Sequence, residues 1–166
     1  SFESTYDARQ STGIGGIYAQ AGIEYGALSA HAGVRHDEHQ DFGGATSFGA
    51  DVSYAIVPGL RLRASVGEGF KAPSLFQLYS DYGNAALQPE DSTSYDVGLA
   101  YGTRLSPVYA SITAFQRDSE NLIAFVGCPV QTGICDNRPL GTYDNVSQAR
   151  ARGVEVEAGA TPVNGL

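Results

Sequence analysis

The sequence predicts an all-β protein, and three observations support this class. Seven segments alternate apolar residues with polar or small ones, which is the period of a strand with two different faces. The composition includes 21 Gly and 10 Tyr; glycine weakens helices, and aromatic residues suit pleated surfaces. The connections between the segments are short and long in turn. Together these features predict a curved antiparallel sheet.

The alternating segments have a similar pattern along the whole chain. They cover residues 17–24, 28–35, 48–56, 60–66, 94–101, 108–115 and 154–159. In the third segment, for example, Val52 and Tyr54 alternate with Asp51 and Ser53. Because side chains of a strand point to opposite sides in turn, each segment is expected to have one apolar and one polar face.

The connections give a second, separate signal. Short turns are expected near residues 25–27, 58–59 and 102–107, and long loops at 37–46, 71–91 and 118–146. Consecutive antiparallel strands place all the short turns at one end of the sheet and all the long loops at the other, as in outer-membrane barrels. Within the second long loop, residues 74–80 are expected to form one helical turn, which Pro73 would begin.

Composition and motifs exclude several functional classes. A net charge of -8 and a pI of about 4.7 repel polyanions, so no nucleic-acid partner is expected. A transmembrane helix needs a run of about eighteen apolar residues, which is not found, but transmembrane strands need none. The chain begins without a signal-peptide pattern and is expected to be mature or internal sequence. No nucleophile elbow, metal-binding helix motif or phosphate loop is found, so neither an enzyme nor a cofactor is expected.

Residues 67–101 (GEGFKAPSLFQLYSDYGNAALQPEDSTSYDVGLAY) contain a dense series of motifs. They resemble a signature of TonB-dependent outer-membrane receptors. In that family a strand ends in Gly-x-x-Phe-Lys/Arg-Ala-Pro, and Leu-x-x-Leu-Tyr, Gly-Asn, Leu-x-Pro-Glu and Ser-x-x-Tyr-(Glu/Asp)-x-Gly follow. The matching residues are Gly67, Phe70, Lys71, Ala72, Pro73, Leu75, Leu78, Tyr79, Gly83, Asn84, Leu87, Pro89, Glu90, Ser92, Tyr95, Asp96 and Gly98.

A second set of residues resembles the same family. The pattern Asn-x-x-x-Ala-x-x-x-Gly-Val-Glu is matched by Asn145, Ala149, Gly153, Val154 and Glu155, and the strand before it by Arg117, Asp118, Asn121, Leu122 and Ile123. Among subfamilies, the combination of Gln77-Leu78-Tyr79, Tyr82-Gly83-Asn84 and Leu87-Gln88-Pro89-Glu90 is most similar to the vitamin B12 (cobalamin) transporters. Siderophore receptors share much of this pattern.

The resemblance implies both a fold and a function. Residues 1–166 are expected to be part of an antiparallel transmembrane β-barrel domain, about seven strands of a roughly 22-stranded barrel whose plug and remaining strands lie outside this chain. Such a receptor in the bacterial outer membrane would take up cobalamin or a ferric siderophore, energised by the TonB complex through the plug, with membrane lipid around the wall. The alternative is a soluble secreted or periplasmic β-barrel or sandwich that binds a ligand, because alternation also fits the inverted arrangement.

The candidate site residues fall into two groups. Tyr79, Tyr82 and Asn84 are expected to face the substrate where the barrel mouth narrows. Six charged residues on polar faces are expected to face the lumen, either pairing between strands or contacting the plug and substrate: Arg61, Arg63, Asp51, Asp96, Glu155 and Glu157. Lys71 and Glu68 are placed at the outer rim, where cross-strand pairing with Glu90 or Asp91 is an equal alternative to a functional role.

Cys128 and Cys135 lie in a stretch rich in turn-forming residues, GCPVQTGICDN. Their spacing predicts a local disulfide, as expected in an oxidising compartment. The alternatives are two unpaired thiols or half of a metal site.

No metal site is predicted, although the segment around residues 31–41 is rich in possible ligands. The spacing of its histidines fits no tetrahedral zinc site, and its carboxylates are either solvated or an oxygen-rich calcium site. The residues concerned are His31, His36, His39, Asp37, Glu38 and Asp41.

Overall fold

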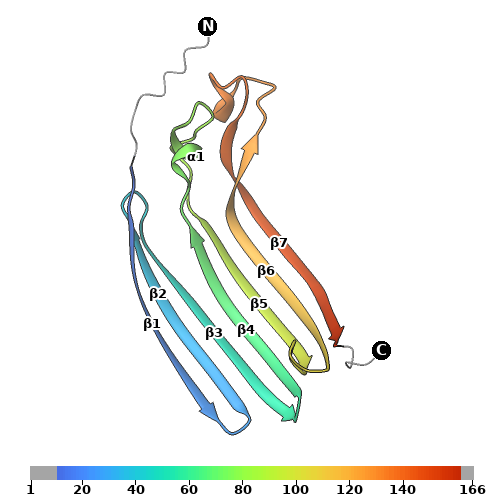
Figure 1. Ribbon diagram of the computed structural model, residues 1–166. Helices are drawn as coiled ribbons and strands as arrows, with labels where there is room; N and C mark the ends of the chain where they lie inside the picture. The colour runs from blue at the N-terminus through green and yellow to red at the C-terminus, as the bar shows by residue number, and fades with distance from the viewer. Residues whose placement is uncertain (1–10, 162–166) are drawn as a thin grey trace.

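The computed structural model describes residues 11–161, without the side chain of Ser147, and forms a single seven-stranded sheet (Figure 1). Each strand pairs antiparallel with the next in sequence, from β1 to β7. The strands are β1 (Ile14–Tyr25), β2 (Leu28–His39), β3 (Gly43–Val57), β4 (Leu60–Lys71), β5 (Glu90–Tyr101), β6 (Val108–Val126) and β7 (Thr142–Ala160). The helix α1 (Leu75–Tyr79) and the 3-10 turn η1 (Gly133–Cys135) lie between strands. The predicted all-β class is confirmed.

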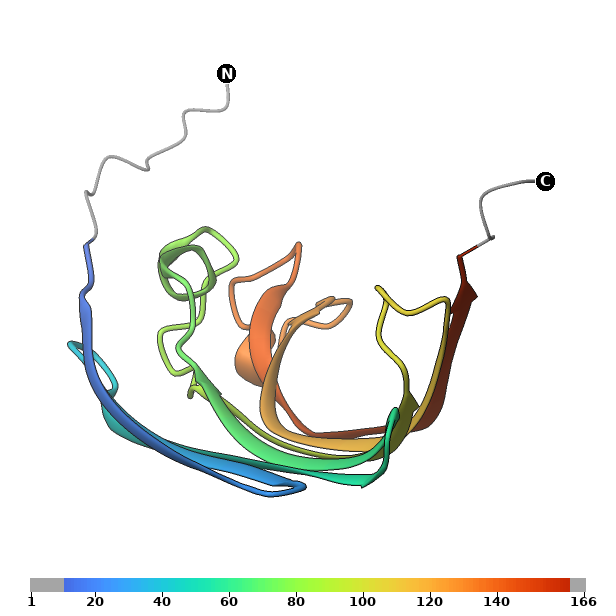
Figure 2. The same cartoon turned by 60° about the horizontal axis from the view of Figure 1, so that its bottom comes forward.

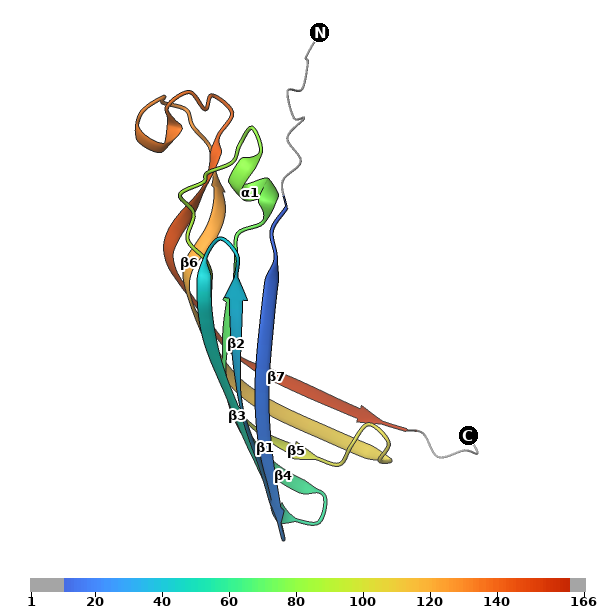
Figure 3. The same ribbon diagram turned by 90° about the vertical axis from the view of Figure 1, so that its left-hand side faces the viewer.

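The sheet curves into an open trough between β1 and β7 (Figure 2). It is also twisted, so that β7 runs at an angle to β1 (Figure 3). A hollow of about 280 Å³ lies on the sheet and is lined by the polar side chains of Asp51, Arg63, Ser65 and Asp96. The polar face is therefore the concave one.

The opposite, convex face of the sheet is apolar and exposed. Ile17 is 76% exposed, Val156 74% and Ile112 49%, and they belong to a longer series of exposed apolar side chains on all seven strands. Soluble monomers rarely expose a continuous apolar surface of this extent. In the described part of the chain, the buried apolar side chains are Pro73, Leu78, Leu87, Cys128 and Cys135, none of which lies on a strand. The sheet is thus a wall and not one layer of a sandwich.

The two ends of the sheet differ, as Figure 1 shows. The turn end holds the connections 26–27, 58–59 and 102–107, where Gly26, Gly59 and Gly102 adopt positive φ angles of 59°, 85° and 65°. Residues with side chains rarely adopt such angles, so glycine is required in these tight turns. The loop end holds the connections 40–42, 72–89 and 127–141, and α1 lies in the second.

Two of the predicted long loops are wrong in extent. The loop expected at 37–46 is only the turn 40–42, because Asp37 to His39 pair with Ala45 to Gly43 as strands. The loop expected at 118–146 is confined to 127–141, since β6 and β7 continue towards it. At 37–39 and 118–121 polar residues occupy both faces, and at 122–126 apolar residues do, so the alternation is hidden although the backbone remains paired. Strands that rise beyond a bilayer meet water on both sides and need no apolar face.

Among residues 11–161, no helix is long and apolar enough to cross a membrane.

Candidate functional site

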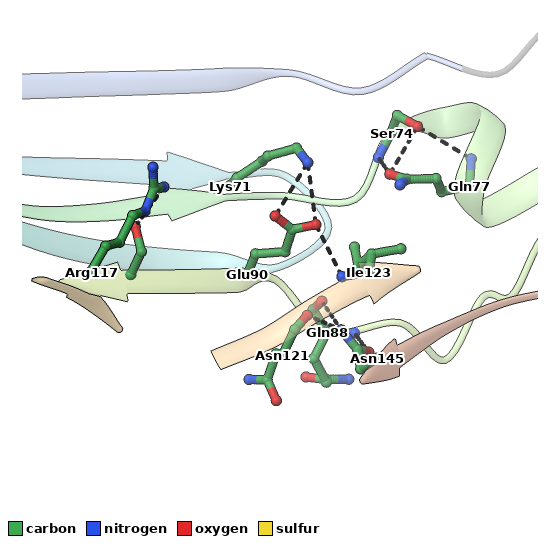
Figure 4. Close-up of polar contacts among 10 residues, drawn as sticks. Lys71, Ser74, Gln77, Gln88, Glu90, Arg117, Asn121, Ile123 and Asn145 are labelled. Carbon is green, nitrogen blue, oxygen red and sulfur yellow. Dashed lines mark hydrogen bonds and ion pairs between the residues drawn. The ribbon is translucent and has the colours of Figure 1, made fainter. Parts of the chain in front are cut away.

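The 72–89 loop begins with a helix that the local sequence specifies. Ser74 is the N-cap of α1: its Oγ accepts a hydrogen bond from the backbone N of Gln77 at 3.3 Å, and Gln77 Oε1 accepts one from the backbone N of Ser74 at 2.9 Å (Figure 4). This reciprocal capping box satisfies two N–H groups that the first turn leaves free. The predicted helical turn is confirmed, with Pro73 just before the cap and not inside the helix.

The rest of the 72–89 loop folds back on α1. The backbone N of Asn84 donates to Gln77 O at 2.8 Å, and Asn84 Oδ1 accepts from the backbone N of Ala86 at 3.0 Å. A Cβ at Gly83 would lie 2.6 Å from the carbonyl oxygen of Leu78, so the close approach of the backbone requires glycine. Leu87, 1% exposed, is buried within the loop region. The loop is therefore a compact unit that presents Phe76 and Tyr79 to solvent.

This loop is joined to the start of β7. The carbonyl oxygen of Tyr82 accepts hydrogen bonds from the backbone N of Tyr143 and from Thr142 Oγ1, both at 3.1 Å. Asn84 Nδ2 donates to Tyr143 O at 3.0 Å. Thr142 is fully buried, and its hydroxyl group needs a protein partner because water cannot reach it. The bond to Tyr82 O supplies this partner.

Four aromatic side chains extend these contacts across the loop end. Tyr82 meets Phe125 at a ring-centroid distance of 5.9 Å, Phe125 meets Tyr143 at 5.5 Å, and Tyr143 meets Phe76 at 6.2 Å. All three pairs are edge-to-face, the arrangement that the charge distribution of aromatic rings favours. Sequence analysis missed this cluster, because its members come from α1, the loop after it, β6 and β7.

The 127–141 loop is closed by a disulfide between Cys128 and Cys135, both of which are buried. Inside it, Gln131 Nε2 donates to Cys128 O and Gln131 Oε1 accepts from the backbone N of Arg138, both at 3.1 Å. The Arg138 guanidinium donates to Thr142 Oγ1. The disulfide-closed loop is thus connected through Arg138 and Thr142 to the 72–89 loop.

We expect replacement of both cysteines, Cys128→Ser with Cys135→Ser, to loosen the 127–141 loop and leave the sheet intact. The crosslink restricts only a short segment, and the sheet has its own continuous backbone pairing. Limited proteolysis of the full-length protein should then cut within 127–141, and its heat-modifiable gel mobility should stay as in the wild type. Equal protease resistance in both proteins would contradict this.

The predicted lumen charges share the concave face, and most contact a neighbouring element. Arg61 Nη1 donates to Ser53 Oγ at 2.7 Å, and Asp51 Oδ2 lies 3.0 Å from His31 Nδ1. Two more polar contacts extend the set: Ser65 Oγ donates to Asp96, and Arg104 Nη2 donates to Glu157 Oε1 at 2.8 Å. Arg63 lines the hollow together with Asp96. Glu155 lies opposite Thr113 in the register of β6 and β7. These contacts fit the alternative in which the charged residues pair with neighbouring strands.

The predicted substrate-facing residues have different environments. Tyr79 is 40% exposed, Tyr82 is half-buried in the aromatic cluster, and the Asn84 side chain is engaged inside the loop end. All three lie in one loop, away from Glu157 and Arg61 near the turn end. In the part of the chain that the structure describes, no group of three or more His, Cys, Asp or Glu could hold a metal ion.

A sheet with an exposed apolar convex face, a polar concave face and elaborated loops at one end only is the wall of an outer-membrane type of β-barrel. The family model described as "TonB dependent receptor-like, beta-barrel" matches residues 1–164. The chain belongs to the TonB-dependent receptor family.

Individual relatives agree with this assignment. The chain is 32% identical over 143 residues to the vitamin B12 transporter BtuB of Vibrio cholerae serotype O1 (strain ATCC 39541 / Classical Ogawa 395 / O395); the match covers 85% of this chain and 21% of that protein. The structure of this chain is similar to that of the siderophore receptor PirA from Pseudomonas aeruginosa, with a TM-score of 0.73 and 26% identity. The match covers 86% of this chain and 27% of that one. A variant of the ferric enterobactin receptor PfeA from Pseudomonas aeruginosa, in complex with enterobactin, gives a TM-score of 0.72 and 26% identity over 86% of this chain and 24% of that one.

The chain therefore spans about a fifth of the length of the curated relative and about a quarter of these solved structures.

Proposed function

We propose that this chain, residues 1–166, is part of the barrel domain of a bacterial outer-membrane receptor that takes up a large metal-containing nutrient, cobalamin ahead of a ferric siderophore. The observation that carries the proposal is the division of the sheet: an apolar convex face for lipid, a polar concave face for the lumen, and a structured loop end. By its family, the receptor would be energised by the TonB complex through a plug domain. No chemical step is needed, since the substrate is carried and not transformed.

Cobalamin is placed first because of the relative that matches the sequence. The BtuB protein of Vibrio cholerae is a vitamin B12 transporter, whereas the two solved structures compared above are a siderophore receptor and a ferric enterobactin receptor. Tyr79 and Tyr82 are proposed to face the substrate, because both lie in the structured 72–89 loop and Tyr79 is accessible. The proposed role of Asn84 is weakened, since its side chain already bonds within the loop end.

The alternative, a soluble ligand-binding β-barrel or sandwich, requires the apolar face to be covered as a core. On the described strands that face is exposed, with Val156 at 74%. This favours the membrane receptor.

The test is uptake by the full-length receptor in cells that lack their own cobalamin and enterobactin receptors. We expect labelled cyanocobalamin to accumulate, and the accumulation to disappear when tonB is deleted, because family members depend on TonB for energy. Accumulation of ferric enterobactin but not cyanocobalamin would support the proposed uptake function and show that the nutrient is a ferric siderophore instead of cobalamin. Uptake of neither, from a receptor shown to be in the outer membrane, would contradict the proposed substrates.

A further inference from the structure

Two polar side chains, Glu90 and Asn145, join the end of the 72–89 loop to the β6–β7 hairpin (Figure 4). We call this pair the clamp. Glu90 Oε1 accepts hydrogen bonds from Lys71 Nζ at 3.2 Å and from the backbone N of Ile123 at 3.1 Å. The pairing of β5 with β6 stops at Asp91, so the Glu90 carboxylate replaces the missing strand partner at the β6 edge. One carboxylate thereby links β4, β5 and β6.

Asn145 makes the second half of the clamp with a single carboxamide. Its Oδ1 accepts from the backbone N of Gln88 at 2.8 Å, and its Nδ2 donates to Gln88 O at 2.9 Å and to Asn121 O at 2.6 Å. A primary amide offers one acceptor oxygen and two donor hydrogens, and all of these functions are used here. Gln88 therefore pairs with Asn145 as it would with the backbone of another strand.

The clamp is not the only attachment of the loop. At its middle, Tyr82 O and Asn84 Nδ2 bond to Thr142 and Tyr143, as described above. The loop is thus fixed to β7 at its middle and at its end. Segments that open readily have few buried contacts. This loop buries the side chains of Leu78 and Leu87 and is bonded to β7 at two places, although the hydrogen bonds between Asn145 and Gln88 are themselves exposed to solvent.

We propose that Asn145 is a positioning residue: the clamp makes the 72–89 loop a static part of the receptor mouth and not a lid that closes over the ligand. It holds α1, with the accessible side chains of Phe76 and Tyr79, at a set place relative to the β6–β7 hairpin. The ligand-binding half of this inference rests on the proposed function, while the static nature of the loop stands on the contacts alone.

Hydrogen exchange in the full-length receptor, held in outer-membrane vesicles, tests the static loop. Asn145→Leu removes all three hydrogen bonds at similar size, and Asn145→Asp keeps the acceptor but loses both donors. In each variant we expect the backbone amides of residues 82–88 to exchange at least about tenfold faster than in the wild type. Gln148→Leu is the matched control on the same strand, because its side chain makes one long contact, 3.4 Å to Glu120. In this control variant, amide exchange in the 72–89 loop should be the same as in the wild type.

Uptake of cyanocobalamin tests the positioning role. For Asn145→Asp we expect the half-saturation concentration to rise about tenfold while the maximal rate stays within about twofold. A merely structural role would lower the maximal rate, through loss of receptor, at constant half-saturation. If Asn145→Leu fails to reach the membrane, Asn145→Asp carries both measurements.

The outcomes separate the two proposals. Unchanged exchange at 82–88 in both variants overturns the clamp, whatever the uptake shows. Faster exchange with unchanged half-saturation overturns the positioning role. If the wild type takes up neither cyanocobalamin nor ferric enterobactin, the proposed function fails, and the exchange data still decide whether the loop is static.

Discussion

Replacing Ile112 with arginine is expected to destabilise the receptor strongly, whereas the same change at the next residue, Thr113, is expected to be tolerated. Ile112 is 49% exposed on the convex face, between Leu99 of β5 and Val156 of β7. A charge on the lipid face of a β-barrel costs about 2–4 kcal/mol at the bilayer midplane. We expect Ile112→Arg to lower the free energy of unfolding by an amount in that range.

Thr113→Arg is the matched control for this substitution. Thr113 lines the polar hollow together with Asp51 and Asp96, and it lies opposite Glu155 in β7. An arginine there meets water and negative charge, so its cost should be much smaller. The measurement is urea unfolding of the full-length receptor in lipid vesicles, followed by heat-modifiable gel mobility. Equal losses for the two variants, or a larger loss for Thr113→Arg, would show that the two faces have been assigned the wrong way round.

The strands were predictable because one physical constraint governs each of them. A segment such as 108–115 meets apolar surroundings on one side and polar surroundings on the other. Its sequence therefore alternates, and this alternation predicts β6. That constraint ends where both sides meet water. Asp37 and Asp118 lie on strands that the structure continues towards the loop end, and the sequence around them reads as loop. The prediction failed where the environment stopped differing between the faces.

The loop end was only partly predictable, for a different reason. The capping box of α1 and the Cys128–Cys135 disulfide are local, so the residues near each other in sequence reveal them. The clamp depends on register: Asn145 meets Gln88 only because β5, β6 and β7 are consecutive and paired with a particular offset. The family pattern marked Asn145 without indicating a role. Only the folded structure shows that its carboxamide bonds to two separate segments.

Gly98 provides a test of how closely the strands approach on the concave face, and Gly98→Ala is expected to destabilise the sheet by about 2–3 kcal/mol, as overpacking does. Gly98 is buried on β5, opposite Thr113 of β6. A Cβ added there would lie 2.7 Å from Thr113 Oγ1 and 2.8 Å from the carbonyl oxygen of Ile112. The hydroxyl group can rotate away, but the carbonyl belongs to the backbone of the neighbouring strand, so β5 and β6 must move apart. This explains why the Ser-x-x-Tyr-Asp-x-Gly motif ends in glycine here.

Gly49 is the matched control, since it also lies inside a strand, on β3, paired with Gly67 of β4. A Cβ at Gly49 would have its nearest contact at 3.9 Å, with Val66 O, which is ordinary van der Waals distance. Gly49→Ala should therefore be neutral or stabilise by up to about 1 kcal/mol, because alanine reduces the freedom of the unfolded chain. Unfolding of both variants in lipid vesicles gives the comparison. If Gly98→Ala is as stable as Gly49→Ala, the close approach of β5 and β6 at this position is not a constraint on the barrel wall, and the motif glycine needs another explanation.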